Sequence, residues 1–425
     1  MRRARASAAY SIMTIALWDR TFALQRLSAA IGVTNILLNG DWPYQDSKEA
    51  LLRIVRAFEK KKSDIESLDQ DVGDDILRPH CVDARDLLSR MAGLIGFIIR
   101  SSEVRNGFEL YAPIRAIGRA LLGVDIHLII GSEWNYVPFA YPLPISILNE
   151  FVLVGLPAFE ASNALIAPAA GHELGHAVWR RTDLRKELTK RVDAEIVKIV
   201  SDRWGDFSGD FHSGANKDAL LDDLEARSIW AVASNIAARQ CEEIFCDIIG
   251  TYIFGQSFIF ALMYLLLPDN GARQSTAYPS SRRRAEYITS AAERFSVAVP
   301  SEFVSSFRNQ DPPDDKYARA ADDAVQVLVP EIIDSVANYA SRKGIVLPDP
   351  EASRRSKDVL KDLQPPMNYN SVGELLNGAW DVRRELSSWS IPGVVDEGRK
   401  LAILNDLIFQ EPGDSRVVFA EQRPL

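Results

Sequence analysis

The chain of 425 residues carries a net charge of −9, with 47% hydrophobic and 25% charged residues. This balance excludes collagen-like, coiled-coil and wholly disordered chains, and the negative charge argues against a general nucleic-acid binder. At about 150 residues per domain, the length favours two or three domains with a sizeable core. The three cysteines, Cys81, Cys241 and Cys246, are too few for a disulfide framework, so we expect a reducing, cytoplasmic setting.

The N-terminal region, residues 1–120, is predicted to be helical. Asp46 and Glu49 have the spacing of a capping box ahead of a periodic apolar run that begins at Leu51. The mildly apolar stretch 8–18 is interrupted by Asp19 and Arg20, and no small-residue cleavage site follows it. We therefore interpret this stretch as an amphipathic helix and not as a signal peptide.

A central region, residues 121–300, begins with strand patterns. Residues 124–130 alternate apolar and polar side chains, and further strands are predicted at 134–139 and 151–156, the last one ended by Pro157. Pro168 suits the first turn of a helix through the 170s, with a break near Thr182 and Asp183. The glycine-containing segment 204–218 reads as a loop before a second long helix, which starts near Asp222 and continues past Gly250.

The C-terminal region, residues 301–425, is predicted to be helical after the turn-forming segment 311–315. One stretch, residues 248–267, has the length of a membrane span and no charged side chain. It contains Gly250 and Gly255 and ends at Pro268, and no second long apolar segment accompanies it. We interpret it as a buried core helix and expect a soluble protein.

The segment His172-Glu173-Leu174-Gly175-His176 is the one motif whose spacing imposes a chemistry. A four-residue step along a helix places two side chains on one face, so both imidazoles can bind one metal ion while Glu173 reaches a water on that ion. A catalytic zinc site needs three protein ligands and an open position, so a third ligand must come from elsewhere in the chain.

A second element follows 67 residues after His176, where Glu243 precedes Asp247 by one helical turn. The two elements together resemble the HExxH and Glu-x-x-x-Asp motifs of the gluzincin metallopeptidases, such as the thermolysin-like and HtpX-like families. The resemblance is limited to the central third of the chain. It implies one zinc ion bound by His172, His176 and Glu243, with Glu173 as general base and Asp247 orienting a ligand histidine.

Helical phase supports Glu243 independently. Steps of seven from Ile229 through Ile236 reach Glu243 and then Gly250, which places Glu243 on the stripe that faces the core. A carboxylate on an apolar stripe is costly unless a cation compensates it. Glu242 points about 100° away and is the alternative ligand. Gly250 would let the two helices approach closely.

The other cysteine and histidine side chains are weaker candidates for metal ligands. Cys241 and Cys246 are either soft metal ligands or small buried side chains beside the site. His80 and His127 are better explained by solvation or hydrogen bonding, because three ligands are already present.

The expected reaction is amide hydrolysis without a covalent intermediate. In gluzincins the substrate backbone pairs with an edge strand before the motif helix, and residues 151–156 are either that strand or an ordinary sheet strand. The transition state needs a further hydrogen-bond donor. The candidates for this donor are His212, Tyr252, Tyr278, Arg282 and Arg284. The run 282–284 is alternatively a solvated helix start or a site for an acidic substrate group.

The sequence thus predicts an α+β, predominantly helical chain whose zincin-like core has a small sheet beside the motif helix. The predicted function is that of a zinc metallopeptidase acting on a peptide or protein substrate. Two alternatives stay open: a regulatory or interaction protein with an inactive gluzincin-like zinc site, and a zinc hydrolase of non-peptide amides or esters. We expect no nucleic-acid partner and no membrane span.

Overall fold

The computed structural model describes residues 2–42, 44–70, 72–101, 111–134, 138–140, 146–269, 271, 275, 278–366 and 371–410, with side chains from residue 19 onward. Within these residues the chain is predominantly helical with one small sheet, which confirms the coarse fold prediction. The helices are α1 (Arg2–Leu38), α2 (Gln45–Glu66), α3 (Asp74–Arg100), α5 (Tyr111–Leu122), α6 (Ala169–Arg181), α7 (Leu184–Asp202), α8 (Trp204–Phe207), α9 (Leu224–Phe254), α10 (Gln256–Leu266), α11 (Ser281–Phe295), α12 (Lys316–Arg342), α13 (Pro350–Lys361), α14 (Val372–Arg384) and α15 (Glu397–Phe409). The strands are β1 (His127–Glu133), β2 (Phe139–Ala140) and β3 (Phe151–Pro157).

The sheet has the strand order β1-β3-β2, with β1 parallel and β2 antiparallel to β3. The third predicted strand matches β3, whereas the first begins three residues later than predicted, because a turn follows Gly123 with its φ of +117°. Of the second predicted strand, 134–139, residues 135–137 lie outside the described residues, and Phe139 is the one described residue that belongs to a strand. β3 is the central strand, so of the two alternatives for 151–156 the ordinary sheet strand is confirmed and the substrate-binding edge is wrong. Neighbouring strands already pair with both of its edges.

Side chains of the sheet alternate between two hydrophobic clusters, as the period of two along a strand requires. One face packs against helices α1, α2 and α3 through Ile129, Phe151 and Leu153. The other face joins the main core through Leu128, Ile130, Val152 and Val154. The sheet is therefore buried on both faces, and this packing holds β2 and β3 beside α6.

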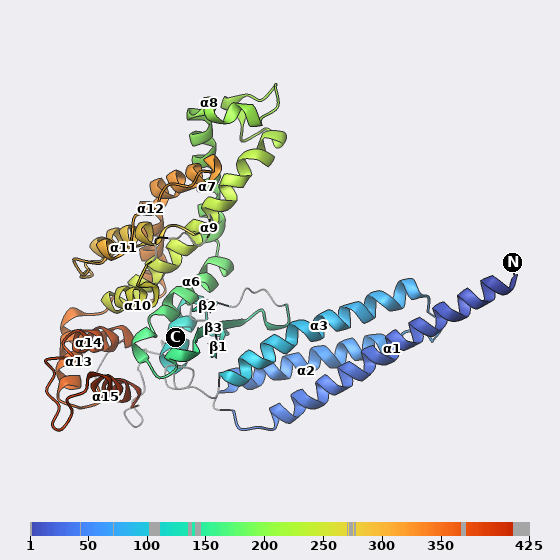
Figure 1. The fold of residues 1–425 in the computed structure, drawn as a ribbon, viewed down its shortest axis with the longest axis horizontal. Coiled ribbons are helices and arrows are strands. Elements are labelled where there is room, and N and C mark those ends of the chain that lie inside the picture. The colour runs from blue at the N-terminus through green and yellow to red at the C-terminus, as the bar shows by residue number, and fades with distance from the viewer. Residues whose placement is uncertain are drawn as a thin grey trace, which may run out of the picture.

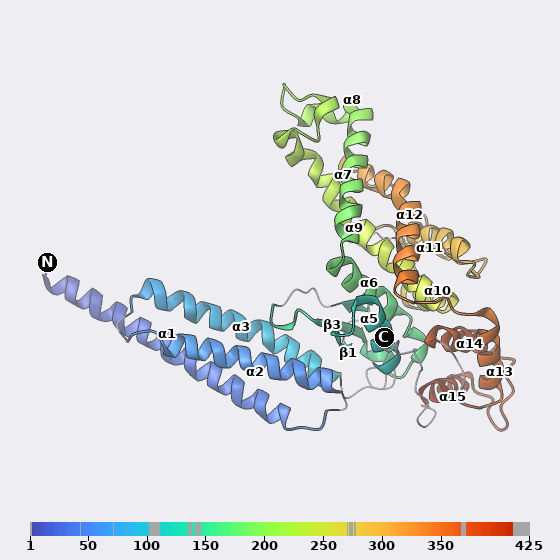
Figure 2. The ribbon, with the colours of Figure 1, turned by 180° about the vertical axis from the view of Figure 1, so that it is seen from behind.

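Helices α1, α2 and α3 lie side by side and form a long arm that extends away from the sheet (Figure 1). Helices α7, α9 and α12 extend from the sheet in a different direction, as the view from behind also shows (Figure 2). We call α1–α3 the arm and residues 111–409 the body. The arm packs on one face of the sheet, and the helices of the body pack on the other.

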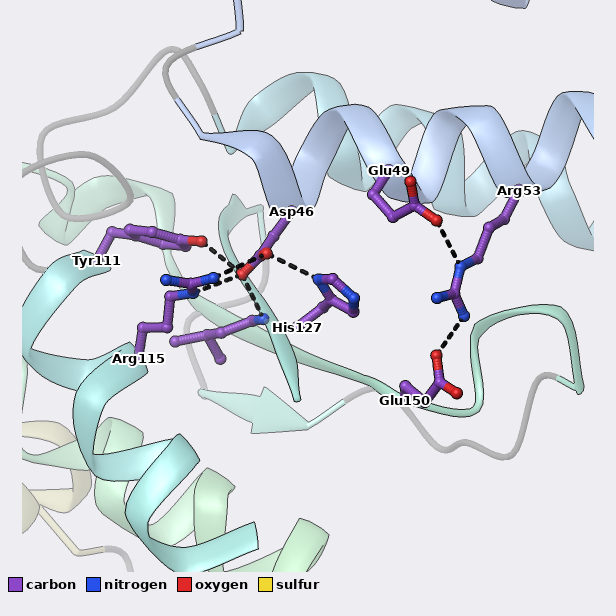
Figure 3. Close-up of polar contacts among 8 residues, drawn as sticks. Asp46, Glu49, Arg53, Tyr111, Arg115, His127 and Glu150 are labelled. Carbon is purple, nitrogen blue, oxygen red and sulfur yellow. Dashed lines mark hydrogen bonds and ion pairs between the residues drawn. The ribbon is translucent and has the colours of Figure 1, made fainter. Parts of the chain in front are cut away.

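Asp46 of α2 ties the arm to the body (Figure 3). Its buried carboxylate accepts hydrogen bonds from the hydroxyl of Tyr111, from Arg115 Nε at 2.8 Å and from the backbone N–H of Leu128 at 3.0 Å. The ring nitrogen Nδ1 of His127 lies 2.8 Å from the other carboxylate oxygen. Burial opposes ionisation, but these hydrogen bonds lower the pKa of Asp46 below 3.8, so the charged form holds α5 and β1 against α2.

The predicted capping box at the start of α2 does not form. The N-cap residue is Tyr44, whose side chain makes no capping bond, and Asp46 bonds to α5 and β1 instead. Glu49 pairs with Arg53 at 2.9 Å, and Arg53 also reaches Glu150 before β3 at 2.6 Å (Figure 3). Long-range partners have displaced the local capping pattern, because a buried carboxylate gains more from a cation than from one backbone N–H.

The helix boundaries around the motif agree with the sequence. Residues 182–183 separate α6 from α7, as predicted. α9 follows its N-cap Asp223, whose carboxylate accepts hydrogen bonds from the backbone N–H groups of Glu225 and Ala226. α6, α7, α11, α12 and α14 all pack against α9, which is therefore the central helix of the body.

The C-terminal helices support the segment that leads into α6. The indole of Trp380 donates to the carbonyl of Leu165 at 3.0 Å, and the side-chain oxygen of Asn405 accepts from the backbone N–H of Ala164 at 2.8 Å. α12 begins after Asp315, at the predicted boundary, and packs along α7 and α9.

The apolar stretch 248–267 runs through the end of α9 and the whole of α10 and is largely buried in the body. The chain turns between the two helices at Gly255, whose φ of +60° suits glycine. Among the described residues, a different stretch, Asp19–Leu38 of α1, is long and apolar enough to cross a membrane by length and composition. The sequence prediction did not single out this stretch.

Candidate active site and metal centre

The two motifs lie on α6 and α9, which cross with very little space between their backbones. A methyl group added at Gly175 would lie 2.8 Å from the Cα atom of Cys246, and one added at Gly171 would lie 3.2 Å from the Cα atom of Gly250. Real Cβ atoms essentially never lie within 3.0 Å of another heavy atom, and the methyl group at Gly171 would also lie 2.8 Å from the ring of Phe254, so a larger residue at either position would force its neighbours to shift. The expected close approach at Gly250 is confirmed, and it brings the side chains of both motifs together.

His172, His176 and Glu243 converge at this crossing. The Nε2 atom of His172 lies 3.4 Å from Oε2 of Glu243, and Nε2 of His176 lies 3.7 Å from Oε1 of the same carboxylate. Ligand atoms about 2.0–2.1 Å from a tetrahedral ion lie about 3.3 Å apart. The distance from each ring to one oxygen of Glu243 is close to that value, which makes this carboxylate a candidate third ligand beside the two imidazoles.

The other nitrogen of each imidazole bonds to a carboxylate of α9. His172 Nδ1 lies 2.8 Å from Asp247 Oδ1, and His176 Nδ1 lies 2.8 Å from Glu242 Oε1. Each carboxylate fixes the orientation of its ring and favours the tautomer that leaves Nε2 as an acceptor. Burial opposes protonation of His172, but its hydrogen bonds to Asp247 and Glu243 raise the pKa of His172 to about 10, and a bound metal ion would displace the proton from Nε2.

Asp247 is held by a buried arginine from a third helix. Arg284 of α11 donates from Nε to Oδ2 and from Nη2 to Oδ1 of Asp247, both at 2.8 Å. The side chain of Asp247 is 1% exposed, and although burial opposes ionisation, the charge of Arg284 keeps the pKa of Asp247 far below its usual range. Since two charges out of water are tolerated only with close pairing, Arg284 keeps Asp247 ionised and directed at His172.

Glu173 is buried beside the two histidines, and its environment differs from that of the other carboxylates. Its Oε2 atom has no hydrogen-bond partner, and the backbone of Ala140 in β2 donates to the carboxylate. Burial raises the pKa of Glu173. An unsatisfied buried carboxylate oxygen is costly, so its presence beside two imidazoles points to a polar group that is absent here.

A cleft of about 570 Å³ opens over these residues. Its lining includes His172, Glu173, His176, Glu243 and Arg284, together with the residues of β2 and apolar side chains of α10. Tyr278 also lines the cleft, and the negative charge of Glu243 and partial burial raise the pKa of its phenol. The phenol therefore stays protonated at neutral pH and can donate a hydrogen bond into the cleft.

Cys246 offers a second donor set with the same histidines. Its sulfur and one nitrogen of each of His172 and His176 all lie within 4.8 Å of one another, so these three residues form a group that could hold a metal ion. Cys246 is fully buried between α6 and α9, and burial raises the pKa of its thiol well above the ordinary value. Unlike Glu243, it does not line the cleft.

The remaining nominated residues have other contacts. His212 pairs with Asp223 in the loop before α9, Tyr252 packs edge-on against Phe295, and Arg282 pairs with Glu286. None of these three lines the cleft. Of the five transition-state donor candidates, Tyr278 and Arg284 line it, and both guanidinium bonds to Asp247 commit Arg284 to that carboxylate.

Sequence reasoning missed three positioning contacts. Glu242 was considered as a ligand, yet it bonds the far side of His176 and also lies 3.3 Å from Arg180. Arg284 was considered as an oxyanion donor and instead holds Asp247. The backbone contact of Ala140 depends on a two-residue strand. Helical spacing places Arg180 one turn after His176, but it does not show which side chain of α9 lies opposite.

The chain was compared with protein-family models, with curated proteins and with solved structures, and none of them matches.

Proposed function

We propose that this protein is a zinc-dependent peptidase with a gluzincin-like site on a zincin-like core, acting by general-base hydrolysis of peptide bonds. The proposal is carried by one observation: two imidazole Nε2 atoms face the carboxylate of Glu243, beside the unpartnered oxygen of Glu173. Two histidines and one carboxylate are a ligand set that zinc takes in peptidases. The cleft beside them leaves room for a substrate.

A bound zinc ion would supply Lewis acidity and lower the pKa of a coordinated water towards about 7. Glu173 would then accept the proton of the attacking water and pass it to the leaving amine. Its raised pKa, caused by burial, suits a group that both takes and returns a proton near neutral pH. Asp247 and Glu242 keep both rings in place during this exchange.

The substrate backbone would pair with β2, the edge strand whose Phe139 and Ala140 line the cleft. Tyr278 would donate to the oxyanion that develops on the scissile carbonyl. The variant Tyr278→Phe should then lower kcat by about a hundredfold with little change in KM. An unchanged kcat would remove Tyr278 from this role.

The test of the proposed function uses Glu173→Gln, with Glu187→Gln on the exposed side of α7 as a matched control. Zinc content and cleavage of a mixed peptide library are measured for both variants and for the unaltered chain. We expect Glu173→Gln to keep zinc and lose cleavage by at least about a thousandfold, while Glu187→Gln retains both. Retained cleavage in Glu173→Gln would refute the mechanism.

A second candidate function is favoured by Cys246, whose sulfur lies near both histidines. If Cys246 bound the ion together with both histidines and Glu243, four protein ligands would close the metal site, and the protein would use zinc structurally, as a regulatory or interaction protein. X-ray absorption of the zinc-loaded protein separates the two cases, because Zn–S scattering at about 2.3 Å differs from Zn–N and Zn–O scattering at about 2.0–2.1 Å. The peptidase proposal requires the absence of the sulfur shell.

A further inference from the structure

A second groove of about 610 Å³ continues from the cleft, and its charge is unusual for this acidic chain. Four arginines line the groove: Arg180, Arg181, Arg185 and Arg239. The one acidic residue in its lining is Glu242, which also borders the cleft. In a chain with a net charge of −9, a groove with four guanidinium groups and one carboxylate is a distinct positive surface.

The groove and the cleft are neighbours along the same two helices. Their linings share Ala140, Arg180, Arg239 and Glu242. Arg180 lies one turn after His176 on α6, and Arg239 lies one turn before Glu243 on α9, so each is displaced by about 6 Å along its helix. Since an extended peptide advances about 3.3 Å per residue, a chain crossing the cleft reaches these arginines about two residues from the scissile bond.

The four arginines differ in whether their guanidinium groups already have a partner in the protein. Arg180 contacts Glu242, and Arg181 donates to the backbone carbonyl of Phe151, which fixes the floor of the groove. Arg185 and Arg239 are exposed, and among the described residues no carboxylate lies within ion-pairing distance of either guanidinium group. These two charges are therefore available to a ligand.

We propose that this groove is a specificity site that binds Asp or Glu side chains of the peptide substrate, about two or more residues from the bond that is cleaved. This inference rests on the proposed peptidase function. Guanidinium groups bind carboxylates with paired hydrogen bonds, and two unpaired arginines at the rim also attract acidic peptides before they dock. Ala140 lines both the cleft and the groove, so one extended peptide can occupy both.

The test measures binding separately from cleavage. Zinc-loaded Glu173→Gln protein is titrated with three fluorescent peptides of equal length that carry Glu, Gln or Lys at the flanking positions. We expect the Glu peptide to bind about tenfold more tightly than the Lys peptide at low salt, with a smaller difference at high salt. Equal affinity for the three peptides would overturn the proposal.

Substitutions test whether Arg185 and Arg239 cause the preference for the Glu peptide. In the Glu173→Gln background, Arg185→Gln with Arg239→Gln should reduce the Glu-over-Lys preference to within about twofold. Arg191→Gln is the matched control, because Arg191 lies on the same helix as Arg185 but pairs with Glu331 outside the groove. A preference that survives the double substitution, or is lost in Arg191→Gln, would contradict the assignment.

Cleavage by the unaltered chain distinguishes failure of this inference from failure of the proposed function. Cleavage of the three peptides at equal rates would refute the groove as a specificity site and leave the peptidase function intact. Arginine-dependent binding of the Glu peptide, with no cleavage of any peptide, would support the groove as an acidic-peptide site and refute the peptidase.

Discussion

Gly175 sets the distance between the two motif helices, so replacing it should disturb the proposed metal centre without changing a proposed ligand. In Gly175→Ala the new methyl group would lie 2.8 Å from the Cα atom of Cys246 and 2.8 Å from Cγ2 of Ile249. Carbon atoms in contact prefer about 3.5–4.0 Å. The neighbours are backbone and a branched side chain in a buried helix, so α6 must move away from α9 by up to about 1 Å.

A shift of this size has consequences for both stability and metal binding. Overpacking of this kind costs about 1–3 kcal/mol, partly offset by the better helix propensity of alanine. The distance from His172 Nε2 to Glu243 would rise from 3.4 Å towards about 4.4 Å, well beyond the roughly 3.3 Å that a tetrahedral ion needs. Because metal sites tolerate deviations of only about 0.2 Å in bond length, we expect zinc affinity to fall by about tenfold to a hundredfold.

Urea unfolding and zinc competition with a chromophoric chelator measure the two effects. The matched control is Gly32→Ala in α1, where a methyl group would meet nothing within 4 Å. That variant should be unchanged or slightly more stable, by up to about 1 kcal/mol, with the same zinc affinity. A Gly175→Ala protein with unaltered stability and zinc affinity would refute the argument that this close approach builds the site.

Two other substitutions test the buried charges. Arg284→Gln leaves Asp247 without its cation, so it should lower the free energy of unfolding in urea by about 3–5 kcal/mol and weaken zinc binding at least about tenfold. The control Arg282→Gln, at a more exposed pair with Glu286, should cost less than about 1 kcal/mol. Equal effects of both substitutions would contradict the role of Arg284. Asp46→Asn should destabilise the chain by about 2–4 kcal/mol at neutral pH. Because the folded-state pKa of Asp46 lies below 3.8, its stabilisation is present above that pH and is lost as pH falls through the folded-state pKa. The difference in unfolding free energy between the two proteins should therefore shrink from about pH 5 to pH 3, and a constant difference would refute the ionised network.

Helical spacing is a local property, so the sequence could predict which side chains of each motif lie on the same face of a helix. A four-residue step fixes the relative placement of His172 and His176, and the sevenfold phase of α9 places Glu243 on its inward side. The structure brings both elements together, with Asp247 bonded to His172. The same helical phase points Glu242 away from Glu243, as predicted. The phase did not show that Glu242 would bond to Nδ1 of His176.

Features that depend on distant partners were not predictable in the same way. The residue pattern around Asp46 matches a local cap, yet its partners Tyr111 and His127 come from elements 65 and 81 residues later. β2, an edge strand of the sheet, has two residues and is too short to have a period, so the sequence offered the longer β3 as one candidate for the edge. The arginine groove combines side chains from three helices, and none of the four carries a sequence pattern that indicates the others.

The most direct measurement is zinc content by elemental mass spectrometry on protein purified without added metal, together with three single variants. The account predicts about one zinc per chain, lost in His176→Ala and Glu243→Ala and retained in Cys246→Ser. Absence of zinc from the unaltered chain, even after zinc is added, would contradict the metal centre. Zinc retained in Glu243→Ala but lost in Cys246→Ser would place the sulfur, and not the carboxylate, in the ligand set.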